Sequence, residues 1–79
     1  MLDQLSGSAK VVVVKQVRRA LASGRAKALF LAKDADPALT GPLSAQAEEQ
    51  GVAVTWTASM RELGRACGIA VGAAVAATV

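Results

Sequence analysis

Cationic and amide side chains cluster at residues 15–19, directly after an apolar run. Placed at about 100° per residue, Lys15, Gln16, Arg18 and Arg19 fall on one half of a helix. Lys15 and Arg19 are four residues apart, so their like charges lie over one another and disfavour an isolated helix. Lys and Arg bind phosphates and the guanine edge, and Gln pairs with a base edge. At the positive end of a helix dipole, this pattern indicates an anion or nucleic-acid site, although a solvated polar helix face would show the same pattern.

The stretch Thr57, Ala58, Ser59 and Met60 is a second candidate. Small residues and an exposed methionine could form an apolar shelf for an unstacked base, a mode of contact that RNA recognition often uses. The alternative is a plain strand-to-helix turn in which Met60 fills the core. Ser59 and Glu62 fit a capping box, with Ser59 as the N-cap.

The remaining candidates favour structural roles. Asp34 and Asp36 could suggest a metal or acid–base pair, but two acids beside a helix start usually cap it, and no third ligand is visible. Cys67, the single cysteine, is expected to be a small buried hydrophobe. Phe30 and Trp56, the only aromatic residues, are expected in strands of the core. Because the chain has no histidine, a zinc site or a histidine-based catalytic pair is not expected.

Alternating strands and helices position these residues. The pattern predicts strands at 11–14, 27–32, 52–57 and 75–79, helices at 15–23, 42–50 and 60–67, and a short helix at 2–8. The run Val11–Val14 is typical of a strand buried on both faces. Asp36 and Pro37 suit a cap and a first helical position, whereas Gly41 and Pro42 are expected to interrupt a helix that begins there.

Helix ends and inward positions can also be assigned. Gly24, Gly51 and Gly68 are expected to end the three longer helices, and Leu43 and Ala47, with Gln46 as a further candidate, are expected to point inward. Strands that alternate with helices require crossover connections, which place helices on the faces of a sheet. The prediction is an α/β fold: a three-layer α/β/α sandwich with a mixed sheet of about four strands, in a single domain of residues 1–79.

The charge of the chain is unevenly distributed. The net charge is +3 over 79 residues, but residues 1–33 hold seven basic residues against one acid, and residues 34–79 hold two against five. Such a molecule would meet a polyanion with one particular face. No signal-peptide pattern is visible, and the longest uncharged stretch, Ala66–Val79, is too short to span a bilayer. We expect a cytoplasmic protein without a membrane partner.

Several motifs, in order and at matching spacings, resemble the kink-turn-binding large-subunit ribosomal protein family, in particular its small bacterial YbxF-like members. The resemblance covers nearly the whole chain and rests on these stretches: Lys15-Gln16, Arg19-Ala20-Leu21 and Gly24; Ala32-Lys33-Asp34-Ala35-Asp36-Pro37; Glu49-Gln50-Gly51-Val52; Ser59-Met60, Leu63-Gly64-Arg65-Ala66-Cys67-Gly68-Ile69 and Val71-Gly72-Ala73-Ala74.

The resemblance implies a mixed-sheet α/β/α protein that binds kink-turns, which are sharply bent RNA loops built on tandem sheared G·A pairs. It maps the residues that read those pairs onto Lys15, Gln16 and Arg19, and the loop that packs on an extruded base onto residues 57–60. One position departs from the pattern: the family normally has glycine where this chain has Val13. If Val13 points into the sheet the effect is small, whereas if it points at RNA the affinity falls.

The leading hypothesis is a monomeric, non-enzymatic RNA-binding protein, ribosome-associated or ribosomal-protein-like, without cofactor or metal. The RNA-contacting residues would be Val14, Lys15, Gln16, Arg18, Arg19, Lys33, Asp34, Thr57, Ala58, Ser59, Met60 and Arg65. Within this set, Arg18, Lys33 and Arg65 would neutralise phosphates. The alternative is a protein-interaction module with weak or no RNA affinity, which would use the Ala- and Val-rich C-terminal segment as an apolar patch. An enzyme is the weakest alternative, because no nucleophile–base pair can be assembled.

Overall fold

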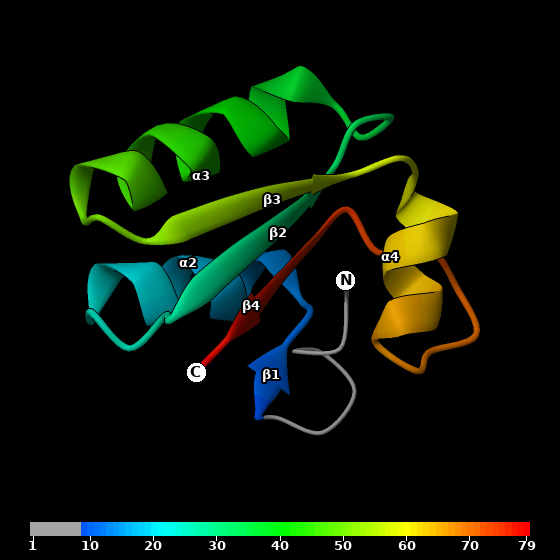
Figure 1. Ribbon diagram of the computed structural model, residues 1–79, viewed down its shortest axis with the longest axis horizontal. Coiled ribbons are helices and arrows are strands. Elements are labelled where there is room, and N and C mark those ends of the chain that lie inside the picture. Colours follow the sequence, from blue (N-terminus) through cyan, green and yellow to red (C-terminus); the bar gives the residue numbers. More distant parts are fainter. Residues whose placement is uncertain (1–8) are drawn as a thin grey trace.

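Strands and helices alternate within residues 9–79, the part of the chain that the computed structural model describes (Figure 1). In that part the strands are β1 (Lys10–Val11), β2 (Ala28–Ala32), β3 (Ala53–Thr57) and β4 (Val75–Thr78). The helices are α2 (Val14–Ala22), α3 (Pro37–Glu49) and α4 (Met60–Ala66). The helix expected at residues 2–8 lies outside the described residues.

The strands form one mixed sheet in the order β1-β4-β2-β3. β2 pairs in parallel with β3 and antiparallel with β4, and β4 pairs antiparallel with β1. β1, β2 and β3 therefore run in one direction, so their carboxyl ends meet at the same edge of the sheet. The connections at residues 12–13, 33–36 and 58–59, together with residues 67–74 before β4, converge there. We call this side of the sheet the loop edge; it lies at the ends of the strands and is distinct from the two edge strands, β1 and β3.

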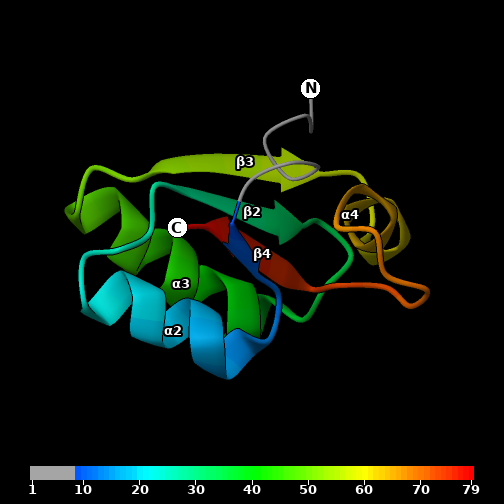
Figure 2. The same ribbon diagram turned by 90° about the horizontal axis from the view of Figure 1, so that it is seen from below.

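Helices cover both faces of the sheet, as expected for a three-layer sandwich (Figure 2). On one face, α2 and α3 pack on the sheet through a buried cluster that includes Val17, Leu21, Leu29, Leu31 and Leu43. On the other face, α4 packs near the loop edge through a cluster that includes Phe30, Ala32, Leu63, Cys67 and Ala76. Successive side chains of β2 point to opposite faces of the sheet, as in any pleated strand. Leu29 and Leu31 therefore pack in one cluster, and Phe30 and Ala32 pack in the other.

The helix ends follow the sequence closely. Asp36 caps α3 by accepting a hydrogen bond from the Ala38 N–H at 2.9 Å, and Pro37 is the first helical residue. Ser59 caps α4 by accepting from the Glu62 N–H at 3.1 Å. Gly24 directly follows the C-cap of α2 with φ +73°, a conformation that residues with a side chain rarely adopt. Gly51 and Gly68 occupy the same position after α3 and α4.

Helix α3 corrects one expectation, because it is continuous through Gly41 and Pro42. Pro42 cannot donate to the carbonyl four residues earlier, but the fixed φ of proline suits a helix and one lost hydrogen bond is tolerated. Burial along one face of α3 outweighs that loss. The residues on this face are Thr40, Leu43 and Ala47, which are buried, and Gln46, which is half-buried.

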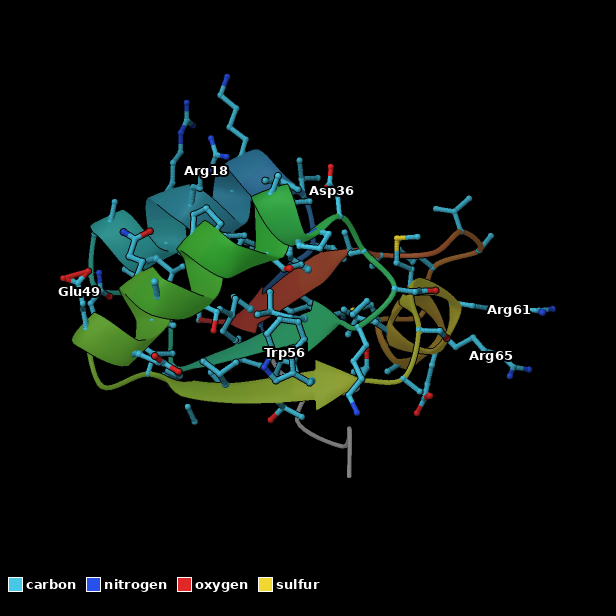
Figure 3. All side chains as sticks on the ribbon, turned by 90° about the horizontal axis from the view of Figure 1, so that it is seen from above. Arg18, Asp36, Glu49, Trp56, Arg61 and Arg65 are labelled. Carbon is cyan, nitrogen blue, oxygen red and sulfur yellow. The ribbon has the colours of Figure 1, made fainter. Side chains whose placement is uncertain are left out.

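Two further expectations were wrong. The strand expected at Val11–Val14 is limited to Lys10–Val11, and it lies at an edge of the sheet, half-buried. The Val17 N–H donates to the Val13 carbonyl at 2.9 Å, which draws Val13 and Val14 into the start of α2. Trp56, expected in the core, is 43% exposed, because β3 is the other edge strand and α3 only partly covers its side chain (Figure 3). Phe30 is buried, as expected.

Candidate nucleic-acid interface

The first turns of α2 present the cationic and amide side chains to solvent. Val17, Ala20 and Leu21 are fully buried on the inner face of the helix, which fixes its rotation about its own axis. The outer face carries the exposed side chains expected from the sequence: Lys15, Gln16, Arg18 and Arg19. Val14, the first helical residue, is half-buried and packs against the core, so its side chain is less accessible than those of the outer face.

The amino end of α2 lacks a side-chain cap. Val13 occupies the N-cap position and makes no side-chain hydrogen bond to the helix, whereas Asp36 and Ser59 cap α3 and α4. The first N–H groups of a helix have no partner within the helix and favour an acceptor or an anion. In α2, that preference is added to the charge of the neighbouring cationic side chains.

Val13 projects from this same end of α2. Its side chain is 59% exposed, and its backbone at φ −80° and ψ 133° is extended. Valine adopts this conformation without strain, so the position does not require glycine for backbone reasons. What valine adds here is side-chain bulk at the open end of the helix.

The segment 33–36 joins the end of β2 to α3 and is tied to the start of α4. The Asp34 carboxylate accepts a hydrogen bond from the Met60 N–H at 2.7 Å, and the Lys33 N–H donates to the Thr57 carbonyl at 3.0 Å. Asp34 therefore stabilises the first turn of α4, while Asp36 caps α3. The expected capping of the adjacent helix is confirmed for Asp36, whereas Asp34 bonds the first N–H group of a different helix, α4. The Lys33 side chain is exposed at the loop edge.

The stretch Thr57–Met60 is only partly accessible. The Thr57 side chain is buried, with its hydroxyl within 3.3 Å of the Leu31 carbonyl oxygen, and Ser59 is half-buried by its capping role. Ala58 is exposed, and Met60 is 36% exposed. The structure therefore leaves Ala58 and Met60 as the contact side chains of this stretch, and Met60 does not fill the core.

Two exposed apolar residues were missed by the sequence reasoning. Ile69 and Val71 are 37% and 71% exposed in the segment that follows α4. This segment runs along α4: the Ala73 N–H donates to the Met60 carbonyl at 2.9 Å, and the Ile69 N–H donates to the Gly64 carbonyl at 3.0 Å. We call Met60, Ile69 and Val71 the apolar patch. The sequence feature that could have identified them is a pair of branched apolar residues between Gly68 and Gly72, outside any expected helix or strand.

Close packing holds the apolar patch in place. A Cβ atom at Gly64 would overlap the Val71 carbonyl oxygen, so this approach requires glycine. A Cβ atom at Gly72 would lie 3.2 Å from the Met60 Cβ, tighter than ordinary van der Waals contact. The patch, α4 and the segment 33–36 therefore form one connected unit at the loop edge.

Arg65 does not join the cations of α2. It extends from the outer side of α4, beside Arg61, whereas Arg18 lies on the outer face of α2 at another side of the molecule (Figure 3). Asp36 lies between the two groups in this view. The loop edge thus separates two cationic faces.

A sequence profile of the Ribosomal protein L7Ae/L30e/S12e/Gadd45 family matches residues 3–79. The chain belongs to this family. An RNA-binding protein of Bacillus pumilus (strain SAFR-032) is 43% identical over 76 residues, which cover 95% of this chain and 93% of that protein. RNA-binding protein YbxF of Geobacillus stearothermophilus is 44% identical with the same coverage. The resemblance seen in the sequence is thereby confirmed.

Solved structures of similar proteins agree with the L7Ae-family fold. A Giardia lamblia 15.5kD RNA binding protein superimposes with a TM-score of 0.81 at 30% identity. The match covers 89% of this chain, which spans 59% of the Giardia chain. A protein of unknown function from Bacillus halodurans C superimposes with a TM-score of 0.85 at 21% identity, over 98% of this chain and 81% of the other, and supports the fold alone.

Both bacterial relatives are named as RNA-binding proteins, which agrees with the expected non-enzymatic, RNA-binding role. The Cys67 thiol is buried, as expected, and burial raises its pKa, an effect that the charge of Lys10 partly offsets.

Within residues 9–79, no three His, Cys, Asp or Glu side chains lie close enough together to hold a metal ion. In the same range no helix is long and apolar enough to cross a membrane.

The protein-interaction alternative expected the C-terminal segment to form an exposed apolar patch, and the strand in that segment is buried instead. Val75–Thr78, the core of the Ala- and Val-rich C-terminal segment, forms the internal strand β4 and is buried throughout. Only the residues before this strand contribute exposed apolar side chains, and they lie at the loop edge beside Met60.

Proposed function

We propose that this L7Ae-family chain is a monomeric RNA-binding protein that recognises kink-turn RNA. The observation that carries the proposal is the uncapped amino end of α2, with its exposed cationic and amide side chains, at the same sheet edge as an apolar patch. An uncapped helix end surrounded by cations suits phosphates, and an apolar patch suits an unstacked base. The names of the bacterial relatives and of the Giardia protein, all RNA-binding proteins, support the same assignment.

The proposed roles follow from position. Lys15, Gln16 and Arg19 read the sheared G·A pairs, because their exposed side chains carry the donors and acceptors suited to base edges. Lys15 and Gln16 lie in the first turn of α2, and Arg19 lies on the same outer face in its last turn. Arg18 and Lys33, exposed at and near this end, neutralise phosphates of the adjoining backbone. The backbone of Val14 contributes through its N–H group at the first helical position.

The extruded base packs against Met60 and the neighbouring Val71, with Ala58 at the margin. Met60 and the segment that carries Val71 are connected by the hydrogen bond from the Ala73 N–H to the Met60 carbonyl. Thr57, Ser59 and Asp34 then act as positioning residues, because their hydrogen bonds hold the start of α4 in place. Of the expected residues in this region, Met60 and Ala58 would therefore contact the RNA, and the three positioning residues would support them.

The decisive experiment is a titration of the protein against two RNA hairpins at several salt concentrations. One hairpin carries a kink-turn, and the other has its G·A pairs replaced by Watson–Crick pairs. We expect tighter binding to the kink-turn, with log K falling as log salt rises in proportion to the phosphates contacted. Equal affinity for the two hairpins would contradict kink-turn recognition while leaving general RNA binding in place.

Sedimentation of the RNA-free protein tests the proposed monomer. A single species near the mass of one chain, 8.0 kDa, is expected, because the C-terminal strand that could have paired two copies is buried within the sheet. A tight dimer would revive the protein-interaction alternative. Co-sedimentation with ribosomal subunits from the same cells would test the expected ribosome association.

A further inference from the structure

The roles proposed above leave two arginines on the outer side of α4 unassigned: Arg65, expected from the sequence to neutralise phosphates, and Arg61, which was not expected in the site. Arg61 and Arg65 are one helical turn apart, and both are exposed. Leu63, which lies between them in sequence, is buried, so the helix faces the core with its other side. Both guanidinium groups extend into solvent and away from the rest of the molecule (Figure 3).

The stability of α4 does not explain this pair. Like charges at positions i and i+4 disfavour a helix, and α4 has only 7 residues. Arg65 lies in the last turn, where a cation is favourable, but Arg61 lies in the first turn, where the helix dipole disfavours positive charge. Glu62 offsets part of that effect. An arrangement that is unfavourable for the helix alone is compensated when an anion binds outside it.

Helix α4 is also firmly positioned relative to the base-binding region. Its first turn is fixed by the Ser59 cap, by the Asp34 carboxylate and by the hydrogen bond from the Ala73 N–H to the Met60 carbonyl. The close contact between Gly64 and Val71 fixes its middle. The arginines therefore hold a defined place beside the apolar patch.

The arginines and the cations of α2 lie on different sides of the loop edge, with the acidic residue Asp36 between them (Figure 3). A single straight duplex lying on α2 would leave the α4 face unoccupied. A bent RNA has two stems that diverge from its kink, so two separate cationic faces fit two phosphate backbones. From this arrangement, which rests on the proposed kink-turn function, we infer that Arg61 and Arg65 bind the phosphate backbone of the stem that leaves the extruded base on the side of α4.

We assign the contact to phosphates, because both arginines extend from the outer side of α4 into solvent (Figure 3) and a guanidinium group binds phosphate oxygens in a bidentate manner. Phosphate contacts position a nucleic acid without reading its sequence. The pair therefore contributes affinity and salt dependence, whereas discrimination between kinked and straight RNA stays with α2 and the apolar patch.

The test compares two double variants of equal charge. In Arg61→Gln/Arg65→Gln the α4 pair is removed, and in Arg25→Gln/Lys27→Gln two exposed cations are removed between α2 and β2, at the opposite edge of the sheet. For the α4 variant we expect about tenfold weaker binding to the kink-turn hairpin and a salt slope shallower by about 2. The ratio of kink-turn to straight-hairpin affinity should stay the same, and the control variant should bind like the parent.

Thermal unfolding distinguishes this role from a structural one. Glutamine is a good helix former, and its introduction removes the like-charge pair, so the melting temperature of the α4 variant should be unchanged or slightly higher. Shortening the stem on the α4 side of the RNA should abolish the difference between variant and parent. The inference is overturned if the α4 variant binds like the parent, or if both double variants weaken binding equally. Failure of the parent to discriminate the two hairpins would instead contradict the proposed function.

Discussion

Val13 places an exposed, branched side chain at the N-cap position of α2. Its side chain is 59% exposed there, at the position where the family resemblance implies glycine. Relief of an overlap with RNA, of the kind that costs about 1–3 kcal/mol in packed sites, would tighten binding about 5- to 150-fold in Val13→Gly. Glycine is a better N-cap than valine, which offsets its greater chain entropy, so the melting temperature should change little.

The measurement for Val13 is a titration of parent, Val13→Ala and Val13→Gly against the kink-turn hairpin. Affinity should rise in that order as the side chain shrinks. An unchanged affinity across the three proteins would mean that the RNA does not approach this end of α2 closely.

Asp34 is expected to support RNA binding indirectly, by stabilising the start of α4. Its carboxylate accepts from the Met60 N–H at 2.7 Å. Asp34→Ala should lower the free energy of unfolding by about 0.5–2 kcal/mol, as for a lost helix cap, and should weaken binding to the extruded base. Asp34→Asn retains an acceptor oxygen, so in thermal melts it should lie closer to the parent. If the alanine variant melts like the parent, the hydrogen bond does not stabilise α4.

At the scale of elements, α4 and the segment 67–74 act as one unit. A methyl group at Gly64 would overlap the Val71 carbonyl oxygen, so Gly64→Ala should destabilise the protein by about 1–3 kcal/mol and displace the apolar patch. The control is Gly41→Ala in α3, where a Cβ atom meets nothing within 4 Å. There, the gain in helix propensity opposes the preference against helical backbone before Pro42, and little change is expected.

Chemical denaturation of the Gly64 and Gly41 variants measures both effects on one scale. Equal stability of the two variants would show that the segment moves freely away from α4. A loss confined to Gly64→Ala, accompanied by weaker kink-turn binding, would link the packing of this unit to the site.

The elements that could be predicted from sequence are those with local signals. Helix α2 has an apolar face at the right period and a glycine after its end, and Asp36 and Ser59 are caps that act within a few residues. Trp56 could not be placed, because its exposure depends on the sheet order, which leaves β3 at an edge. The four valines before Lys15 carry a strong strand preference, yet only Val11 pairs in the sheet, since β1 has a single partner and Val13 is the N-cap of α2.

The candidate site also combines features that have a local sequence signal with features that have none. The outward face of α2 follows from helical periodicity alone. The bond from the Met60 N–H to Asp34 and the contact of Gly64 with Val71 join residues that are distant in the chain or belong to an irregular segment. No local pattern encodes such contacts, which is why the apolar patch was only half anticipated, through Met60 and without Ile69 and Val71.

At the scale of the whole molecule, the position of charge matters more than its total. The loop edge carries Lys33 and the amino end of α2, with Arg18 one turn further along this helix, whereas the opposite edge carries Arg25, Lys27 and the acidic carboxyl end of α3, with Glu49 (Figure 3). The molecule extends 29 × 27 × 21 Å, and exposed charges are screened beyond about 10 Å at 0.1 M salt. Exposed charges separated by more than this distance act on a bound RNA almost independently.

This independence leads to a comparison at fixed net charge. Arg18→Gln/Lys33→Gln and Arg25→Gln/Lys27→Gln each remove two positive charges from a chain of net charge +3. The first double variant should make the dependence of log K on log salt shallower by about 2, because two phosphate contacts are lost, whereas the second should leave it within error of the parent. If both variants shift the slope equally, attraction by overall charge explains the binding, and the loop edge is not the surface that RNA contacts.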